Sequence, residues 1–425
     1  MEKEFVRLDF YCDSVRDGTH DTPKPTEQGM PLVTSKAIRG GKVFLDECYL
    51  ISQKDFDKIN KRSLVEKWDV LMTMIGTVGR LLLVKDTPHY AIKNIALFKI
   101  GNELKAKWLY YYLLMDSVQN YFEMIANGTS QHFIGLGHMR KLKIPNVTKS
   151  SGKIVEILST YDTLIENNTK RIRLLEKMAE NLYKDWFVRF RFPGHENVEM
   201  ESSKYGKLPN TFGIVKMNEV FDYYIGGGWG EEEQSEGFPE EARVIRGADF
   251  PNIWHYDVSS CPLRYHKVKN YKARQLEDGD IIMEISGGTS EQPVGRTVLV
   301  TEDLLARFPN KRLICASFCK LIRLKKDLVS PYYFYYWMKF LYDTRIIDRF
   351  QLQSTGIINF KFEPFLKRGD VVLPSKEVML AFEKQISLWH KEMNQLAKQN
   401  SLLARQRDLL LPRLMSGKLE VKVKA

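Results

Sequence analysis

The feature that most constrains this chain is a long heptad stripe that occurs twice. Apolar residues recur at steps of four and three from Ile154 to Leu182, and the same spacing returns from Phe382 to Leu410. Charged residues fill the positions between them, and a stripe of this kind is typical of the seam of a coiled coil. We therefore expect two long helices, at about residues 153–187 and 376–410, that pair with each other as an antiparallel coiled coil.

The predicted seam contains one asparagine in each helix, Asn168 and Asn400. A buried asparagine in a coiled coil fixes register and partner at some cost in stability. The alternative is that both asparagines lie at a fraying or solvent-facing part of the seam. The seam residues are Ile154, Leu158, Tyr161, Ile165, Asn168, Ile172, Leu175 and Leu182 in the first helix, and Phe382, Ile386, Trp389, Met393, Leu396, Asn400, Leu403 and Leu410 in the second.

The repeat extends into the segments that precede the helices, which is the reason to treat the chain as duplicated. Residues 68–76 parallel residues 279–287, and each segment is followed by a Gly-Arg pair that ends in Arg80 or Arg296. An apolar strand, an aromatic helix, a small polar run and a strand ending in proline then follow in the same order in each half. In the first half, short apolar runs predict strands at 70–75, 81–84 and 95–100, and a helix is expected over 107–126.

These patterns predict an α+β fold with two similar globular domains, each followed by a long helix, related by a pseudo-twofold axis. A helix of about 35 residues is about 50 Å long, so the globules would lie on the order of one to two DNA turns apart. The expected domains are a first globule at 1–150, its helix at 151–190, a linker at 191–207, a second globule at 208–374, and the second helix with its tail at 375–425.

Composition points to a polyanionic partner. The 425 residues carry a formal net charge of +11, whereas the 44% apolar and 28% charged content is ordinary for a globular protein. A chain this basic favours nucleic acid first and an anionic membrane second, with simple solubility as the remaining explanation. No apolar run approaches the length of a membrane span, and the first residues lack a signal-peptide pattern. We expect a cytoplasmic protein.

Catalytic and cofactor-binding motifs are missing from the sequence. It contains no G-x-x-x-x-G-K-[ST], no N-P-P-[YFW], no Pro-Asp dipeptide, no H-E-x-x-H and no G-x-S-x-G. The five cysteines form no metal-like C-x-x-C pair, and Cys315 with Cys319 is expected inside one strand at 313–321. We therefore expect no catalytic residue, no metal and no cofactor in this chain.

Polar and basic loop residues are the better candidates for function. Arg80 and Arg296 occupy matching positions before a strand, where an arginine can grip a guanine edge or a phosphate; the alternative is a salt bridge that holds the loop. The small polar runs at 127–131 and 353–356 suit close approach to a nucleic-acid backbone and bases, or else form helix C-terminal turns.

Two glycine patterns resemble ligand-binding loops. The run 226–230 (GGGWG) suggests a phosphate cradle, but three glutamates follow it at once, which favours a structural turn or a flexible turn near DNA. The F-x-G-x-G at 133–137 matches methyl-donor binding loops, but the other half of the chain lacks it, and we interpret it as coincidence.

Longer motifs carry a family resemblance over essentially the whole chain. They are the segments 17–23 (DGTHDTP) with 31–36 (PLVTSK), 181–187 (NLYKDWF), 226–230 (GGGWG) and, most specifically, 406–419 (QRDLLLPRLMSGKL). With these segments the chain resembles the specificity subunit of type I restriction–modification systems. It departs from the expected pattern at Arg407, which interrupts the second seam and leaves open that this residue faces a partner subunit.

The resemblance implies a DNA-recognition subunit without catalysis. Each globule would read one half of a split, asymmetric double-stranded DNA site, and the helices would set the gap and dock two methyltransferase (modification) subunits that methylate adenine. Motor-nuclease (restriction) subunits would join to cleave unmethylated DNA. The alternative is a two-domain DNA-binding regulator or scaffold without enzyme partners. The candidate DNA contacts are Thr34, Ser35, Lys36, Arg80, Thr129, Ser130, Arg246, Ser286, Arg296, Ser354, Thr355 and Lys361.

Overall fold

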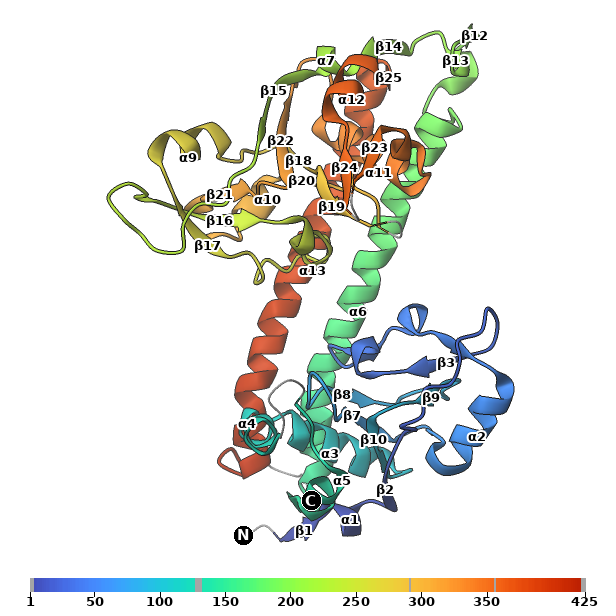
Figure 1. The fold of residues 1–425 in the computed structure, drawn as a ribbon, viewed down its shortest axis with the longest axis vertical. Helices are drawn as coiled ribbons and strands as arrows, with labels where there is room; N and C mark the ends of the chain where they lie inside the picture. Colours follow the sequence, from blue (N-terminus) through green and yellow to red (C-terminus); the bar gives the residue numbers. More distant parts are fainter. Residues whose placement is uncertain (1–3, 127–131, 290–291, 355–356, 422–425) are drawn as a thin grey trace. The chain divides into compact units, whose positions relative to one another are not determined.

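The chain folds into two compact units, each containing helices and strands (Figure 1). The computed structural model describes residues 4–126, 132–289, 292–354 and 357–421. Unit 1 comprises residues 1–165 and 402–425, and unit 2 comprises residues 166–401. The mixed helix and strand content confirms the predicted α+β class.

Both predicted long helices are present. The first, α6 (Ser151–Tyr183), continues into a π-helical turn at Lys184–Val188, and the second, α13 (Lys376–Ser416), is longer than expected. Pro412 lies inside α13 and does not end it. The helix stops at Ser416, and the next residue, Gly417, has a positive φ of 79°, which suits a C-terminal cap.

The two helices pack against each other within each unit. In unit 1, Ile154 and Leu158 near the start of α6 share a buried cluster with Leu411 and Leu414 near the end of α13. In unit 2, Ile172 of the later part of α6 shares a cluster with residues 393–397 of the earlier part of α13. Early residues of one helix thus meet late residues of the other, so the pairing is antiparallel, as predicted.

The central sheet of unit 1 has four strands, and three of them match the predicted ones. Their order is β2-β10-β7-β8, and all neighbours are antiparallel. The strands are β2 (Ser14–Asp17), β10 (Ile95–Lys99), β7 (Val70–Thr73) and β8 (Leu81–Leu83). Strands β10, β7 and β8 are almost completely buried, whereas the edge strand β2 is not. This burial explains why the three strands appear in the sequence as continuous apolar runs.

Unit 2 contains a sheet with the same topology. Its order is β15-β22-β18-β20, again antiparallel throughout. The strands are β15 (Phe221–Gly226), β22 (Cys319–Leu324), β18 (Ile281–Glu284) and β20 (Thr297–Leu299). The single strand expected at 313–321 is wrong, since β21 (Leu313–Cys315) and β22 are separate strands joined by a turn.

Further elements repeat in each unit around these sheets. A pair of antiparallel strands closes each globule, and a short helix follows the first strand of the pair. In unit 1 these are β1 (Phe5–Arg7), β11 (Lys143–Pro145) and α1 (Leu8–Tyr11); in unit 2 they are β14 (Gly213–Lys216), β25 (Asp370–Leu373) and α7 (Met217–Val220).

An aromatic helix covers each central sheet. In unit 1 it is α3 (Glu103–Leu114), and the single helix expected over 107–126 is wrong. Met115 adopts an extended conformation (φ −63°, ψ 135°), so α3 ends there and α4 (Asp116–Ile125) begins anew. In unit 2 the aromatic helix is α11 (Pro331–Asp343), which starts with proline at a position where the missing N–H costs nothing.

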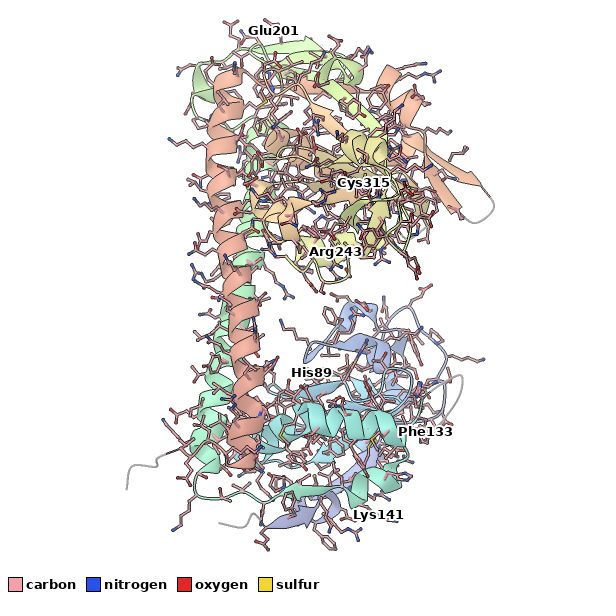
Figure 2. All side chains as sticks on the ribbon, turned by 90° about the vertical axis from the view of Figure 1, so that its left-hand side faces the viewer. His89, Phe133, Lys141, Glu201, Arg243 and Cys315 are labelled. Atoms are coloured by element: carbon pink, nitrogen blue, oxygen red, sulfur yellow. The ribbon has the colours of Figure 1, made fainter. Side chains whose placement is uncertain are left out.

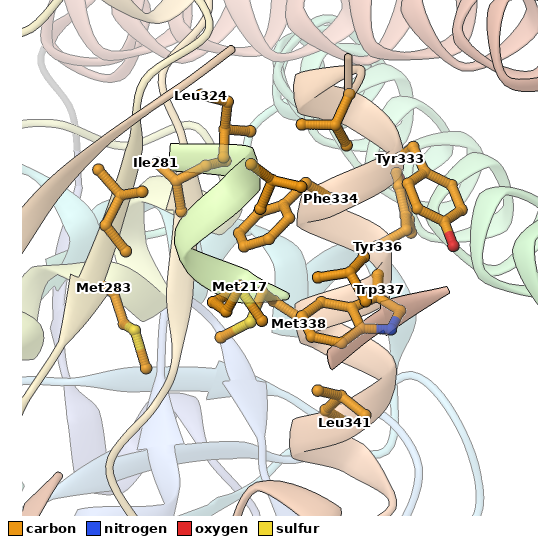
Figure 3. Packing of buried hydrophobic residues seen from close by; sticks show 14 of the residues in the cluster. Met217, Ile281, Met283, Leu324, Tyr333, Phe334, Tyr336, Trp337, Met338 and Leu341 are labelled. Atoms are coloured by element: carbon orange, nitrogen blue, oxygen red, sulfur yellow. The ribbon is translucent and has the colours of Figure 1, made fainter. Parts of the chain in front are cut away.

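The main core of unit 2 lies between α11, the sheet and the long helices. Figure 3 shows Phe334, Trp337 and Met338 of α11 in the same buried cluster as Ile281 and Met283 of β18, with Met217 between the two groups. Aromatic rings pack edge to face in this cluster, which contributes more than area burial alone. The sheet and the helix are therefore held as one rigid support for the loops at the strand ends.

The segment expected to be a polar linker is structured. It contains a hairpin of β12 (Met200–Ser203) and β13 (Gly206–Pro209). Asp370 at the start of β25 accepts hydrogen bonds from Lys204 and, at 2.7 Å, from the Tyr205 hydroxyl. One buried carboxylate therefore ties this hairpin to the second globule.

Among the described residues, no helix is long and apolar enough to cross a membrane.

Candidate nucleic-acid interface

In unit 1, several candidate residues lie on one turn at the end of a strand. Strand β3 (Met30–Val33) pairs in parallel with β9 (Ala91–Ile92), and the chain then turns through η1 (Ser35–Ala37). Thr34 and Ser35 are partly buried on this turn, and Lys36 is exposed. We call residues 34–38 the strand-end turn of unit 1. It presents two hydroxyls and an ammonium group, a set that suits phosphate and base-edge contacts.

The Gly-Arg loop of unit 1 lies against this turn. Gly76 and Gly79 have φ angles of 78° and 86°, which allow the tight connection between β7 and β8. The Arg80 guanidinium donates from Nη1 to the carbonyl of Ile38 at 3.2 Å. The structure therefore joins Arg80 to the last residue of the strand-end turn of unit 1.

The first small polar run, 127–131, lies outside the described residues. Thr129 and Ser130 belong to this run, and Thr355 of the second half also lies outside the described residues. The described residue His132, which follows the first run, accepts a bond from the Gly76 N–H at 3.0 Å, and Phe133, labelled in Figure 2, pairs with Ile75.

In unit 2, an equivalent strand-end turn carries Arg246. Strand β16 (Glu240–Ile245) pairs in parallel with β21 and leads into η5 (Gly247–Asp249). We call residues 246–249 the strand-end turn of unit 2. The Arg246 guanidinium donates two bonds of 2.9 Å to Asp249 and one of 2.8 Å to the Ser260 carbonyl. Arg246 is therefore held rigidly, with part of its side chain exposed.

Arg296 lies in a buried ion pair. Its guanidinium donates to both carboxylate oxygens of Glu284 at 2.8 and 2.7 Å and to the Gly247 carbonyl at 2.9 Å. The exposed fractions of Arg296 and Glu284 are 7% and 5%. Of the two interpretations left open by the sequence, the structure contains the salt bridge at this position.

The remaining candidates of unit 2 lie on or beside a small sheet. It consists of β19 (Ser286–Gly288), β24 (Ile357–Phe360) and β23 (Gln351–Ser354). The Ser286 hydroxyl bonds to the Asn359 amide oxygen at 2.6 Å. Ser354 ends β23, and Lys361 follows β24 at the start of α12 (Phe362–Arg368). The bonds of Ser286 and of Arg246 lead to different partners, so none of these bonds joins the two described side chains.

The glycine-rich run 226–230 is a packed turn. The N–H groups of Gly227 and Gly228 donate to the carbonyls of Cys319 and Cys315 at 2.9 Å. A Cβ at Gly227 would lie 2.1 Å from a backbone oxygen, so only glycine fits there. Because these two N–H groups are already bonded, they cannot cradle a phosphate, and the structural turn is the correct interpretation.

Four of the five cysteines are buried, and Cys48 is partly buried. Cys315, labelled in Figure 2, lies on β21, and burial raises the pKa of its thiol to about 12. Within the described ranges, no cluster of three or more His, Cys, Asp or Glu side chains could hold a metal ion.

The long helices place every predicted seam residue in a buried or partly buried position. The Asn168 amide donates to Gln399 at 3.5 Å, and Asn400 donates to Thr169 at 3.4 Å, so both asparagines lie between the helices. Arg407 does not point away toward a partner; it bonds to Asp162 of α6 at 2.5 Å.

The carboxylates that hold the arginines were not among the predicted residues. Asp249 follows Arg246 by three residues, a spacing that signals a local pair across a turn. Glu284 precedes Arg296 by a whole hairpin loop, and Asp162 pairs with Arg407 across two helices. No local pattern points to these two partners, which only the pairing of strands or helices brings together.

The known proteins that this chain resembles in sequence are specificity subunits of type I restriction enzymes. Residues 18–177 match the family described as type I restriction modification DNA specificity domain. The type I restriction enzyme MjaIX specificity subunit of Methanocaldococcus jannaschii is 22% identical over 369 residues, covering 84% of this chain and 78% of that protein. The HindI specificity subunit of Haemophilus influenzae is 22% identical over 425 residues, covering 88% of this chain and 91% of that protein.

A similar fold occurs in a solved structure. The crystal structure of a type I restriction–modification S subunit from M. genitalium matches with a TM-score of 0.50 at 15% identity. The match covers 97% of this chain and 96% of that one. At this identity the likeness concerns the fold alone.

Proposed function

This chain belongs to the specificity subunits of type I restriction–modification systems, and on that premise we propose that it recognises a bipartite, asymmetric DNA site for enzyme partners. One observation carries the proposal. Each unit contains the same four-stranded sheet with a strand-end turn and a Gly-Arg loop beside it. Two unlike half-sites can be read by two copies of the same sheet that present different side chains at their loops.

The DNA contacts are proposed to come from the loops of each globule. The boundaries assigned from the sequence, 1–150 for the first globule and 208–374 for the second, contain all the candidate contacts. The net charge of +11 supplies attraction to the phosphate backbone that does not depend on sequence.

The partners are proposed to be two methyltransferase subunits and motor-nuclease subunits, acting in the cytoplasm. Support comes from α13, which exposes Leu388, Leu402 and Leu409 by 57%, 53% and 59%. Exposed leucines spaced along one helix are typical of a surface that another protein covers. The chain itself contributes recognition, and the partners carry the methyl donor and the nuclease.

The first test is genome-wide adenine methylation in the native host, compared with a strain that lacks this gene. We expect a bipartite methylated motif that disappears in the deletion strain. If every methylated motif persists, the chain does not direct adenine methylation in that host.

Co-purification tests the regulator or scaffold alternative, which the family membership does not favour. The tagged full-length chain, expressed in its own host, should retain a methyltransferase at two copies per chain. Recovery of the chain with DNA but without a methyltransferase would support a lone regulator instead.

A further inference from the structure

The Gly-Arg loops of the two units have the same backbone frame. In unit 1 the Thr73 N–H donates to the Arg80 carbonyl at 2.9 Å, and in unit 2 the Glu284 N–H donates to the Arg296 carbonyl at 2.9 Å. Thr73 ends β7, and Glu284 ends the matching strand β18. Arg80 and Arg296 are therefore equivalent residues, and so are Thr73 and Glu284.

The equivalent arginines differ in what neutralises them. Glu284 grips Arg296 through two charge-assisted bonds and leaves it almost fully buried. If Arg296 moved away to contact DNA, the Glu284 carboxylate would remain buried without a cation, which is strongly unfavourable. Its third bond, to the Gly247 carbonyl, instead fixes the strand-end turn of unit 2.

Thr73 cannot hold Arg80 in the same way. Its hydroxyl donates to the Thr77 carbonyl at 2.6 Å and carries no charge. Among the residues that the structure describes, Arg80 forms no ion pair, and its guanidinium bond is the one to the Ile38 carbonyl. Arg80 is only partly buried. Most of its five N–H donors therefore remain for a ligand.

We propose that Arg80 reads a guanine in the half-site bound by unit 1, whereas Arg296 is a positioning residue of unit 2. The inference rests on the proposed function and names a residue that determines specificity within it. It follows that the two half-sites are read with different chemistry from the same place in the fold.

Guanine is the base that fits this group. A guanidinium fork donates two parallel bonds to the O6 and N7 acceptors at the major-groove edge of guanine, which no other base presents as a pair. Arg80 bonds to Ile38 of the strand-end turn of unit 1, and the same turn carries the hydroxyls of Thr34 and Ser35 and the ammonium of Lys36, which suit the neighbouring phosphates.

The decisive variant is Arg80→Lys, because lysine keeps the charge and length but loses the planar fork. The full-length wild-type chain and the variant are each bound to duplex pools in which every position of the methylated motif is randomised in turn. We expect the variant to lose its preference at one guanine by about 5- to 150-fold and to keep the other positions. Unchanged preference at every position would overturn the proposal.

A phosphate contact or a purely structural role gives different results. If Arg80→Ala weakens binding equally for all sequences and Arg80→Lys restores it, Arg80 contacts a phosphate, and the proposal is wrong. A lower melting temperature with no change in base preference would assign Arg80 to structure and overturn it equally.

A second variant leaves Arg80 in place. Thr73→Glu places a carboxylate where unit 2 has Glu284, and we expect it to capture Arg80 and erase the same guanine preference. A folded Thr73→Glu variant, verified by its melting temperature, that kept the preference would contradict the proposal.

The matched controls are arginines that should not read bases. Arg16 is exposed on β2 and donates to the Arg62 carbonyl at 2.9 Å, so Arg16→Lys should leave all preferences unchanged. Arg296→Lys should lower the melting temperature without erasing any base preference. Loss of one base preference in Arg296→Lys, with none in Arg80→Lys, would reverse the assignment.

The wild-type chain separates this inference from the proposed function. If the wild type selects no bipartite site, the proposed function fails. If it selects one and the Arg80 variants select the identical site, only the inference fails.

Discussion

At the scale of single residues, the repeat keeps buried carboxylates in place and changes the cations that neutralise them. Asp69 and Asp280 are 1% and 0% exposed at the same position of their units. Asp69 pairs with Lys99 at 2.8 Å, and Asp280 pairs with Arg323 at 2.9 Å. Buried charges survive because each has a charged partner and further hydrogen bonds. The side chains around such a pair can diverge while the frame persists.

Breaking one such pair should destabilise unit 2 strongly. Arg296→Met leaves Glu284 buried without its cation, which should cost about 3–5 kcal/mol in the free energy of unfolding. Urea denaturation measures the loss. The double variant Arg296→Met/Glu284→Met removes both charges and should lose less. A double variant as unstable as the single one would show that the unpaired charge is not the cause.

His390 should make stability depend on pH. Burial lowers its pKa to about 4, and its Nε2 lies 2.9 Å from the Tyr336 hydroxyl. The unfolded chain binds this proton near pH 6.5 and the folded chain only near pH 4, so stability should fall as pH drops from 6.5 to 4. The total loss is at most about 3.5 kcal/mol.

His390→Gln tests this dependence, because it removes the titrating ring and leaves all other groups. Unfolding free energies of wild type and variant are measured by urea denaturation at pH 7.5, 6, 5 and 4. As pH falls, the wild type should lose more stability than the variant, because only the wild type carries His390. Tyr336→Phe keeps the histidine and should retain the pH dependence. A constant difference between wild type and His390→Gln would contradict the assignment.

At the scale of elements, polar side chains determine how the long helices meet the rest of each unit. Tyr111 of α3 donates to Asp162 of α6 at 2.6 Å, and Asp162 also accepts from Arg407 of α13. In unit 2, Tyr336 of α11 bonds to His390 of α13. Each aromatic helix is thus fastened to a long helix by a tyrosine, although the partner differs.

The β12–β13 hairpin should depend on Asp370. Burial alone would raise the pKa of this carboxyl, but bonds from Lys204, Lys216 and Tyr205 outweigh burial and hold the pKa below its usual range. Asp370→Asn should cost about 1–2 kcal/mol at pH 7. Because the folded pKa is the lower one, the contribution is complete above about pH 4 and is lost as pH falls further.

Hydrogen exchange of residues 200–209 measures this effect locally. Exchange in the Asp370→Asn variant should be faster than in wild type at pH 7. Lys204→Met removes a single partner of Asp370 and should have a smaller effect. Equal protection of the hairpin in wild type and Asp370→Asn would show that other contacts hold it.

At the scale of the whole molecule, the two units share a backbone frame but differ in the side chains that the frame presents. The two units share strand order and backbone hydrogen bonds, while the side chains at their strand-end turns differ. The sheets and aromatic helices are buried and therefore constrained by packing, whereas the turns carry exposed or partly exposed side chains such as Lys36 and Arg246. Each unit can change what it presents without changing its fold.

Exchange of one globule should therefore change one half of the recognised site. Replacing residues 208–374 with the matching segment of a relative should alter one half-site of the methylated motif and leave the other half and the spacer length unchanged. Methylome sequencing of a strain carrying the chimera measures this directly. A chimera with both half-sites altered would show that the globules do not read DNA independently.

Several features were predictable because they are periodic or local. The heptad stripes predicted both helices and their antiparallel pairing, and continuous apolar runs predicted β7, β8 and β10, since fully buried strands carry apolar residues on both faces. The prediction of one helix over 107–126 was wrong at Met115, where a residue in extended conformation divides the run into two helices. The prediction of one strand over 313–321 was wrong between Cys315 and Cys319, where a turn separates two strands.

The sequence by itself thus predicted the duplication, the fold class and the family resemblance. Whether Arg80 and Arg296 act on a ligand or hold a loop was decided only by the tertiary structure. The two arginines are indistinguishable in their Gly-Arg context, and the difference arises because strand pairing places Thr73 beside one and Glu284 beside the other. Long-range partners of this kind depend on which strand ends meet in space, and that information is absent from any local pattern of residues.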